Sequence, residues 1–105
     1  MSDPGNFGTV IGQGSLLEGT LLIDHGIRVD GTFRGRVTTP TALLVNDGGE
    51  VESDLVEVGT AEIHGTVVGT IRAQHWVRIG ATARLNGSIE TPRLIVEEGA
   101  MIVNR

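Results

Sequence analysis

Apolar and polar residues alternate along most of this chain, and a short motif interrupts the alternation at regular intervals. The motif is a small residue, any residue and then an aliphatic residue, and its copies are separated by 16, 18, 16 and 18 residues. The five copies are Gly19-Thr-Leu21, Gly35-Arg-Val37, Ser53-Asp-Leu55, Gly69-Thr-Ile71 and Gly87-Ser-Ile89. Alternation with a period of two is typical of strands, and no stretch sustains the 3.6-residue period of a helix. A repeat this short predicts coils that stack on one another to bury their apolar faces.

Aligning the copies predicts four columns of equivalent residues. Relative to the small residue of the motif, the columns lie two residues before it, two after it, eight before it and four before it. In that order they contain Leu17, Phe33, Val51, Val67 and Leu85; Leu21, Val37, Leu55, Ile71 and Ile89; Ile11, Ile27, Val45, Ala61 and Ile79; and Ser15, Gly31, Gly49, Gly65 and Ala83. This register places Val67 inside the stack and its neighbour Val68 outside.

The columns predict an all-β fold, a parallel β-solenoid of about six triangular coils with 16–18 residues each. Small residues suit a column that turns a tight corner or lies close to the coil above. The sixth coil is expected to continue the columns through Ile95, Gly99, Met101 and Val103, with Arg105 at the next apolar position. The 105 residues form one domain over 10–105, preceded by a flexible arm over 1–9. Because coils stack about 4.8 Å apart, six of them would make a rod roughly 30 Å long.

The charged residues are dispersed rather than clustered. The formal net charge is −5, and all eight basic side chains are arginine. In one column Glu18, Arg34 and Glu52 alternate in sign, as cross-strand ion pairs do. Nucleic-acid binding needs a basic stripe, and the sequence contains none. The absence of cysteine and of a signal peptide fits a cytoplasmic protein.

Residues that could carry chemistry do not combine into a site. His25, His64 and His75 fall in different columns, with no carboxylate at a metal-ligand spacing from them. Glu97 and Glu98 are adjacent, so on a strand their side chains would face opposite ways. Phosphate-binding and nucleophile motifs are missing. We therefore expect no enzyme activity and no catalytic, metal or cofactor site.

Three segments of the chain resemble the bactofilins, a family of bacterial polymer-forming cytoskeletal proteins. They read IRVDGTFRGRV, AEIHGTVVGTI and TPRLIVEEGAMI, and the likeness runs from about Val10 to the last residue. The resemblance implies a right-handed β-helix that polymerises end to end, without nucleotide, into non-polar filaments supporting cell shape or envelope organisation. It also implies client proteins of the envelope, and peripheral binding to the inner membrane through a tail whose apolar residues here are Met1 and Phe7.

A physical argument for polymerisation stands beside the resemblance. The first and last coils of a solenoid expose unpaired backbone and apolar side chains, which invite pairing unless they are capped. Two different self-complementary ends on one molecule give an open filament. For the N-terminal contact we expect Val10, Ile11, Leu16, Leu17 and Leu21, and for the C-terminal contact Ile95, Met101, Ile102, Val103 and Arg105.

Arg105 would end an otherwise apolar column with a charge, and two interpretations stay open. In the first, the side chain points into solvent or caps the column. In the second, Arg105 blocks self-association of the C-terminal coils, because two such residues would meet across a twofold axis in a desolvated contact.

Other classes of β-solenoid fit the sequence less well. Left-handed β-helix acyltransferases have strict 18-residue coils with an apolar residue every six positions, whereas this chain alternates 16 and 18. Polysaccharide lyases have longer coils with catalytic loops, for which a chain of this length has no room. The alternative to a polymer is a monomeric β-helix interaction module.

Overall fold

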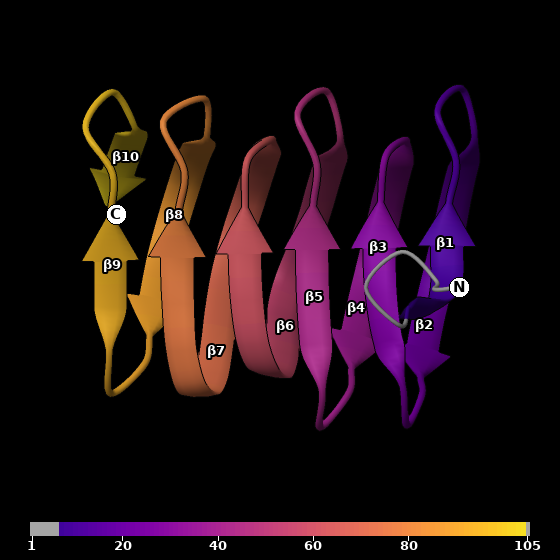
Figure 1. The fold of residues 1–105 in the computed structure, drawn as a ribbon. Helices are drawn as coiled ribbons and strands as arrows, with labels where there is room; N and C mark the ends of the chain where they lie inside the picture. Colours follow the sequence, from indigo (N-terminus) through magenta and orange to yellow (C-terminus); the bar gives the residue numbers. More distant parts are fainter. Residues whose placement is uncertain (1–6, 105) are drawn as a thin grey trace.

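The structure is a computed structural model that describes residues 7–104, and it consists of strands wound around one axis (Figure 1). Every paired strand runs parallel to its neighbours. The described residues contain no helix. The ten strands are β1 Phe7–Ile11, β2 Leu16–Leu22, β3 Gly26–Val29, β4 Thr32–Thr38, β5 Ala42–Val45, β6 Glu50–Ile63, β7 Thr66–Ile79, β8 Arg84–Glu90, β9 Leu94–Val96 and β10 Met101–Asn104.

The strands form about six turns of a right-handed parallel β-solenoid. In Figure 1 the chain rises along β1, crosses to the back, descends along β2 and returns to the front as β3, moving one coil along with each turn. In the fourth and fifth coils a single 14-residue strand, β6 or β7, bends around the corner and covers both sides. The predicted fold class is confirmed.

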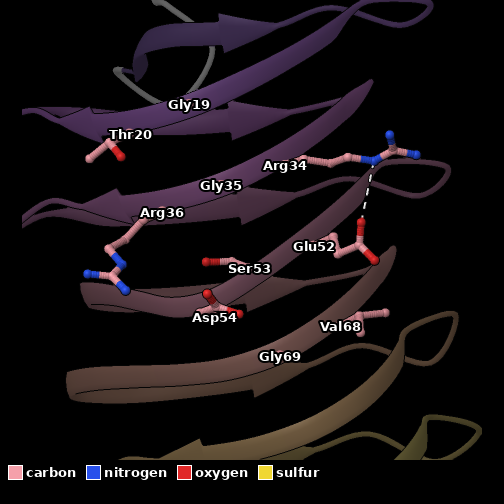
Figure 2. A pocket seen from close by; sticks show the side chains of 10 residues that line it. All are labelled: Gly19, Thr20, Arg34, Gly35, Arg36, Glu52, Ser53, Asp54, Val68 and Gly69. Carbon is pink, nitrogen blue, oxygen red and sulfur yellow. Dashed lines mark ion pairs between the residues drawn. The ribbon is translucent and has the colours of Figure 1, made fainter.

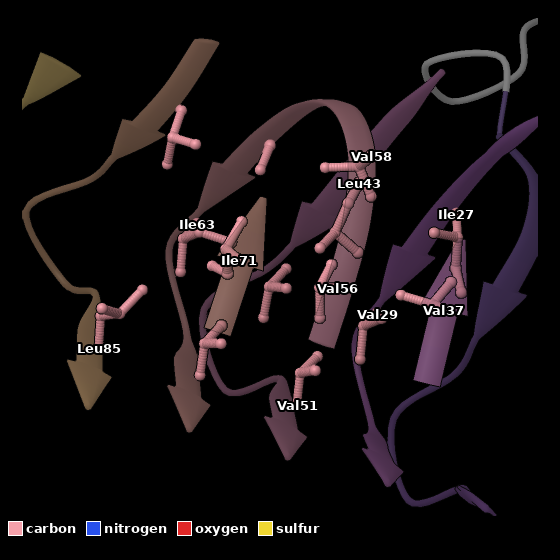
Figure 3. Packing of buried hydrophobic residues seen from close by; sticks show 14 of the residues in the cluster. Ile27, Val29, Val37, Leu43, Val51, Val56, Val58, Ile63, Ile71 and Leu85 are labelled. Atoms are coloured by element: carbon pink, nitrogen blue, oxygen red, sulfur yellow. The ribbon is translucent and has the colours of Figure 1, made fainter. Parts of the chain in front are cut away.

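The core is a ladder of aliphatic side chains along the axis (Figure 3). Most of its members are valine, isoleucine and leucine, with Phe33 as its aromatic residue among the described side chains. Val67 is fully buried, whereas the side chain of Val68 is 39% exposed. The predicted inside and outside positions at this point are therefore correct.

Each long strand bends at a small residue, and the neighbouring coil lies against that bend. Gly35 has a φ of +139°, and a Cβ atom added to it would lie 1.8 Å from the carbonyl oxygen of Gly19 in the preceding coil. Gly69 and Gly87 repeat this geometry against the next coils. Only glycine combines this backbone conformation with so close an approach. The small column of the sequence motif is thus a requirement of coil stacking.

At Ser53 the same bend is made in a different way, and here the predicted register is wrong. Val37 and Ile71 both pair with Val56 rather than with Leu55, because β6 contains an extra residue after Ser53. The Ser53 hydroxyl accepts a hydrogen bond from the Leu55 N–H at 3.1 Å and lies 3.0 Å from the Leu55 carbonyl oxygen, to which it donates. Val56 is fully buried in consequence, and Leu55 is half-buried.

A second correction concerns the column that begins at Ile11. Ile11 pairs with Val29, and the column continues through Val45, Ile63 and Ile79 to Val96. Ile27 and Ala61, which we had placed in it, belong to a parallel column with Leu43 and Val77. The cause is the turns between the two sides, which in the first five coils alternate between four residues, as at 12–15, and two, as at 30–31. Counting back from the motif at a constant distance misses this alternation.

Two features of size also differ from expectation. Regular structure begins at Phe7, inside the segment 1–9 that we expected to be an arm, and Thr9 already pairs with Ile27; residues 1–6 lie outside the described part. The molecule measures 30 × 28 × 27 Å, so the predicted length is right but the shape is a block rather than a rod.

The bulge at Ser53 can be tested with two neighbouring substitutions. Val56→Asp would bury a charge with no partner and should lower the free energy of unfolding by about 3 kcal/mol or more. Leu55→Asp leaves the charge in contact with water and should cost about 1 kcal/mol or less. Urea denaturation followed by circular dichroism measures both, and a larger loss for the Leu55 variant would contradict the register described here.

Candidate self-association surfaces

The last coil presents an apolar end face. Strand β9 and the described side chains of β10 carry six large apolar residues whose exposed fractions lie between 38% and 55%. They are Leu94, Ile95, Val96, Met101, Ile102 and Val103. Apolar groups of this number in contact with water favour association with another surface.

These residues are of two kinds. Leu94, Val96 and Ile102 end the interior columns of Val77, Ile79 and Leu85, and they are exposed because no further coil of the described chain covers them. Ile95, Met101 and Val103 point outward, opposite Arg78, Arg84 and Asn86. At those outward positions the fifth coil is charged or polar, whereas the end coil is apolar. Lack of cover explains the first group but not the second, which indicates selection for contact.

The first coil has a smaller apolar surface of the same type. Val10, Leu16 and Leu22 point outward at positions where the second coil has Arg28, Thr32 and Thr38, and they are 51%, 56% and 81% exposed. Leu17, which ends the interior column of Phe33, is 38% exposed. Both ends of the solenoid therefore carry apolar residues on the outward side as well as along the axis.

The structure separates the residues that we expected at the N-terminal contact. Val10, Leu16 and Leu17 lie exposed on the end coil, but Ile11 is only 5% exposed and Leu21 is partly buried against the core. The sequence analysis missed Leu22, Leu94 and Val96. The signal that could have found them is an apolar residue at an outward position of a terminal coil, or at the end of a correctly aligned interior column.

The sixth coil is shifted by one residue from the predicted alignment. Val96, Ala100 and Ile102, rather than Ile95, Gly99 and Met101, continue the columns of Ile79, Ala83 and Leu85. The last coil is 17 residues long, because both β9 and β10 follow the fifth coil at that distance.

This shift affects the hypothesis about Arg105. Asn104, rather than Val103, lies opposite Gly87. The alignment that put Arg105 in the column of Leu21 and Ile89 therefore does not hold, and Arg105 itself lies outside the described residues, as does Met1. Phe7 begins strand β1.

An ion pair fastens the last coil to the one before it. Arg78 on β7 donates to a Glu97 carboxylate oxygen through Nη2 at 2.6 Å and through Nε at 3.2 Å. This hydrogen bond, with the attraction of the two charges, holds the pKa of the Glu97 carboxyl below its ordinary value of 4.5. Glu97 begins the turn between β9 and β10, so the pair fixes the turn that joins the two apolar strands.

Similar pairs link other neighbouring coils. Arg34 lies 3.9 Å from Glu18 and 3.4 Å from Glu52, which confirms the expected alternation of charge in that column. Arg72 lies between Glu57 and Glu90, and hydrogen bonds to both carboxylates raise its pKa. Each exposed pair contributes little to stability by itself. A stack shifted by one coil, however, would bring like charges together.

The largest hollow is a shallow groove of about 650 Å³ that follows the bends up the outside of the stack (Figure 2). Its walls hold Arg34 and Glu52 on one side and Arg36 and Asp54 on the other, so opposite charges balance. Within residues 7–104 no group of three or more histidine, aspartate or glutamate side chains is placed to hold a metal ion. The same residues form no helix that is long and apolar enough to cross a membrane.

The geometry defines a β-solenoid whose two end coils expose apolar surface, the class of protein that can grow by addition at its ends. Comparison with known proteins gives the family. The model of the bactofilin family, described as polymer-forming cytoskeletal proteins, matches residues 9–105. The chain therefore belongs to the bactofilin family, whose members are cytoskeletal and not enzymes.

Individual relatives agree with this assignment. The chain is 34% identical over 92 residues to bactofilin BacO of Myxococcus xanthus (strain DK1622), covering 88% of this chain and 72% of BacO. It is 35% identical over 97 residues to BacP of the same organism, covering 92% of this chain and 40% of BacP. A crystal structure of a point mutant of the Thermus thermophilus bactofilin superposes with a TM-score of 0.79 at 32% identity, covering 85% of this chain and 98% of that one.

The fastening of the last coil by Glu97 predicts a dependence on pH. Because the folded-state pKa is lowered, the pair stabilises the folded coil above the ordinary pKa of 4.5, and this contribution is lost as the pH falls through the lowered value. Glu97→Gln should speed amide exchange in β9 and β10 at neutral pH and should remove part of the acceleration that acid causes in the original protein. Hydrogen exchange read by mass spectrometry measures this.

Glu98→Gln is the matched control. Glu98 is exposed and makes no ion pair with a described residue, so its loss should leave exchange in β9 and β10 unchanged. Equal acceleration in both variants would show that the Arg78–Glu97 pair does not hold the last coil.

Proposed function

We propose that this bactofilin polymerises through contacts between its end coils, and that the resulting filaments are non-polar and need no nucleotide. The observation that carries the proposal is the apolar character of outward positions on both end coils, where the adjoining coils are polar or charged. Such residues gain from contact with a second copy and gain nothing in a monomer.

The proposed contacts are isologous, which means that each end meets the same end of another copy. The described side chains of β9 and β10 include no charge, so two C-terminal faces can meet without like charges on their strands. Two different isologous ends on one block produce an open filament that reads the same in both directions. Pairing through open strand edges would add backbone hydrogen bonds to the apolar contact.

The cellular part of the proposal is a scaffold that supports cell shape or envelope organisation in the cytoplasm. Peripheral contact with the inner membrane through Met1 and Phe7, and binding of envelope client proteins, belong to the same proposal. Its support is the family membership, together with the absence of a membrane-crossing helix in the described residues.

One pair of variants tests the end contact. Val103 on the last coil and Val68 on the fifth coil both lie opposite Asn86, one on each side of it, and both point outward. Val103→Glu should abolish long filaments, because it puts a charge into the contact, whereas Val68→Glu should leave them intact. Pelleting assays and negative-stain electron microscopy give the readout, with thermal melting to show that both variants fold. Filaments of normal length from Val103→Glu would contradict the proposal, and monomers of the unaltered protein at high concentration would favour the interaction module.

A second experiment tests polarity. Leu16→Glu blocks the N-terminal coil and Val103→Glu the C-terminal coil. In a non-polar filament each variant alone should stop at dimers, joined through its intact ends, and mixing the two should add no further association. In a polar filament each would be monomeric alone and would dimerise only on mixing. Sedimentation velocity of the separate and mixed samples distinguishes these results.

A further inference from the structure

The two end faces differ in composition, and from this difference we infer an order of assembly. We propose that the C-terminal coils associate first and more tightly, so that the building block of the filament is a dimer joined through its C-terminal coils. Growth then proceeds through the weaker contact between N-terminal coils. This inference rests on the proposed function and assigns the second copy of the chain to one end before the other.

The centre of each face differs most. At the C-terminal end the interior columns finish with Leu94, Val96 and Ile102, which are 48%, 48% and 38% exposed. At the N-terminal end the corresponding positions are Thr9, Ile11 and Leu17. Ile11 is already buried within its own molecule and Thr9 is polar, so only Leu17 offers a large apolar surface there.

Most binding energy in protein interfaces comes from large residues near the centre that lose contact with water. The C-terminal face provides three such residues along the axis, surrounded by the outward Ile95, Met101 and Val103. The exposed apolar residues of the N-terminal face are mainly outward ones, Val10, Leu16 and Leu22, which lie at its rim. Its centre would therefore bury less apolar surface in a contact.

Charge acts in the same direction. Glu18 lies on β2 with 64% of its side chain exposed, and its partner Arg34 is 3.9 Å away and is shared with Glu52. An isologous contact through this coil brings two copies of Glu18 to one interface, and like charges there oppose association. At the C-terminal end the nearest carboxylate with a role in the coil, Glu97, is already neutralised by Arg78 at 2.6 Å.

The test compares the two dimers directly. Leu16→Glu leaves the C-terminal contact intact, and Val103→Glu leaves the N-terminal contact intact. The substituted side chains are similarly exposed, at 56% and 53%. Sedimentation velocity over a dilution series gives the dimer dissociation constant of each variant. We expect the constant of Leu16→Glu to be lower by about tenfold or more. Ile95→Glu serves as a second C-terminal variant, and thermal melting confirms folding of all three.

Each other outcome is decisive. If both dimers dissociate at the same concentration, or if the dimer of Val103→Glu is the tighter, the order of assembly is wrong while the end-to-end filament stands. If either variant still forms long filaments, or if dimers appear only on mixing, the proposed non-polar contact is wrong, and the order of assembly fails with it.

Discussion

The constraint on which this structure depends is that a single coil cannot bury its own apolar side chains. Each coil has about 16–18 residues, two of whose sides point toward the axis, and its core residues are covered only by the coils before and after it. Burial is nearly complete in the middle of the stack and incomplete at its ends. The exposure of the end coils is therefore a property of the architecture, and the sequence increases it by placing apolar residues at their outward positions as well.

Close stacking also determines how neighbouring coils recognise each other. The glycines at the bends let one backbone approach the next, and the ion pairs on the outside connect adjacent coils in a set order. The core residues are aliphatic and similar in size, so they distinguish poorly between alternative alignments. Charge and backbone approach supply the discrimination that an aliphatic ladder lacks, although each pair is weak on its own.

Much of the fold could be predicted from the sequence because the period-two alternation and the glycine column follow directly from coil stacking. The prediction failed where the coil length changes locally. The extra residue after Ser53 is compensated within its own coil, so the overall spacing shows no sign of it. The alternation of long and short turns moved Ile27 and Ala61 by two positions, and the 17-residue last coil moved the whole sixth alignment by one. The end residues were found in part because the position of the ends is clear from the repeat, whereas the burial of Ile11 depends on packing that no repeat reveals.

The alternation of long and short turns means that the natural unit of this solenoid is a pair of coils. The column from Ile11 returns after 34 residues at Val45 and after another 34 at Ile79, each time following a two-residue turn and preceding a four-residue one. Gain or loss of one such pair by duplication or deletion would preserve the order of turns and both terminal coils. In evolutionary terms, the thickness of the subunit can change in steps of two coils while its ability to join to other copies is inherited unchanged.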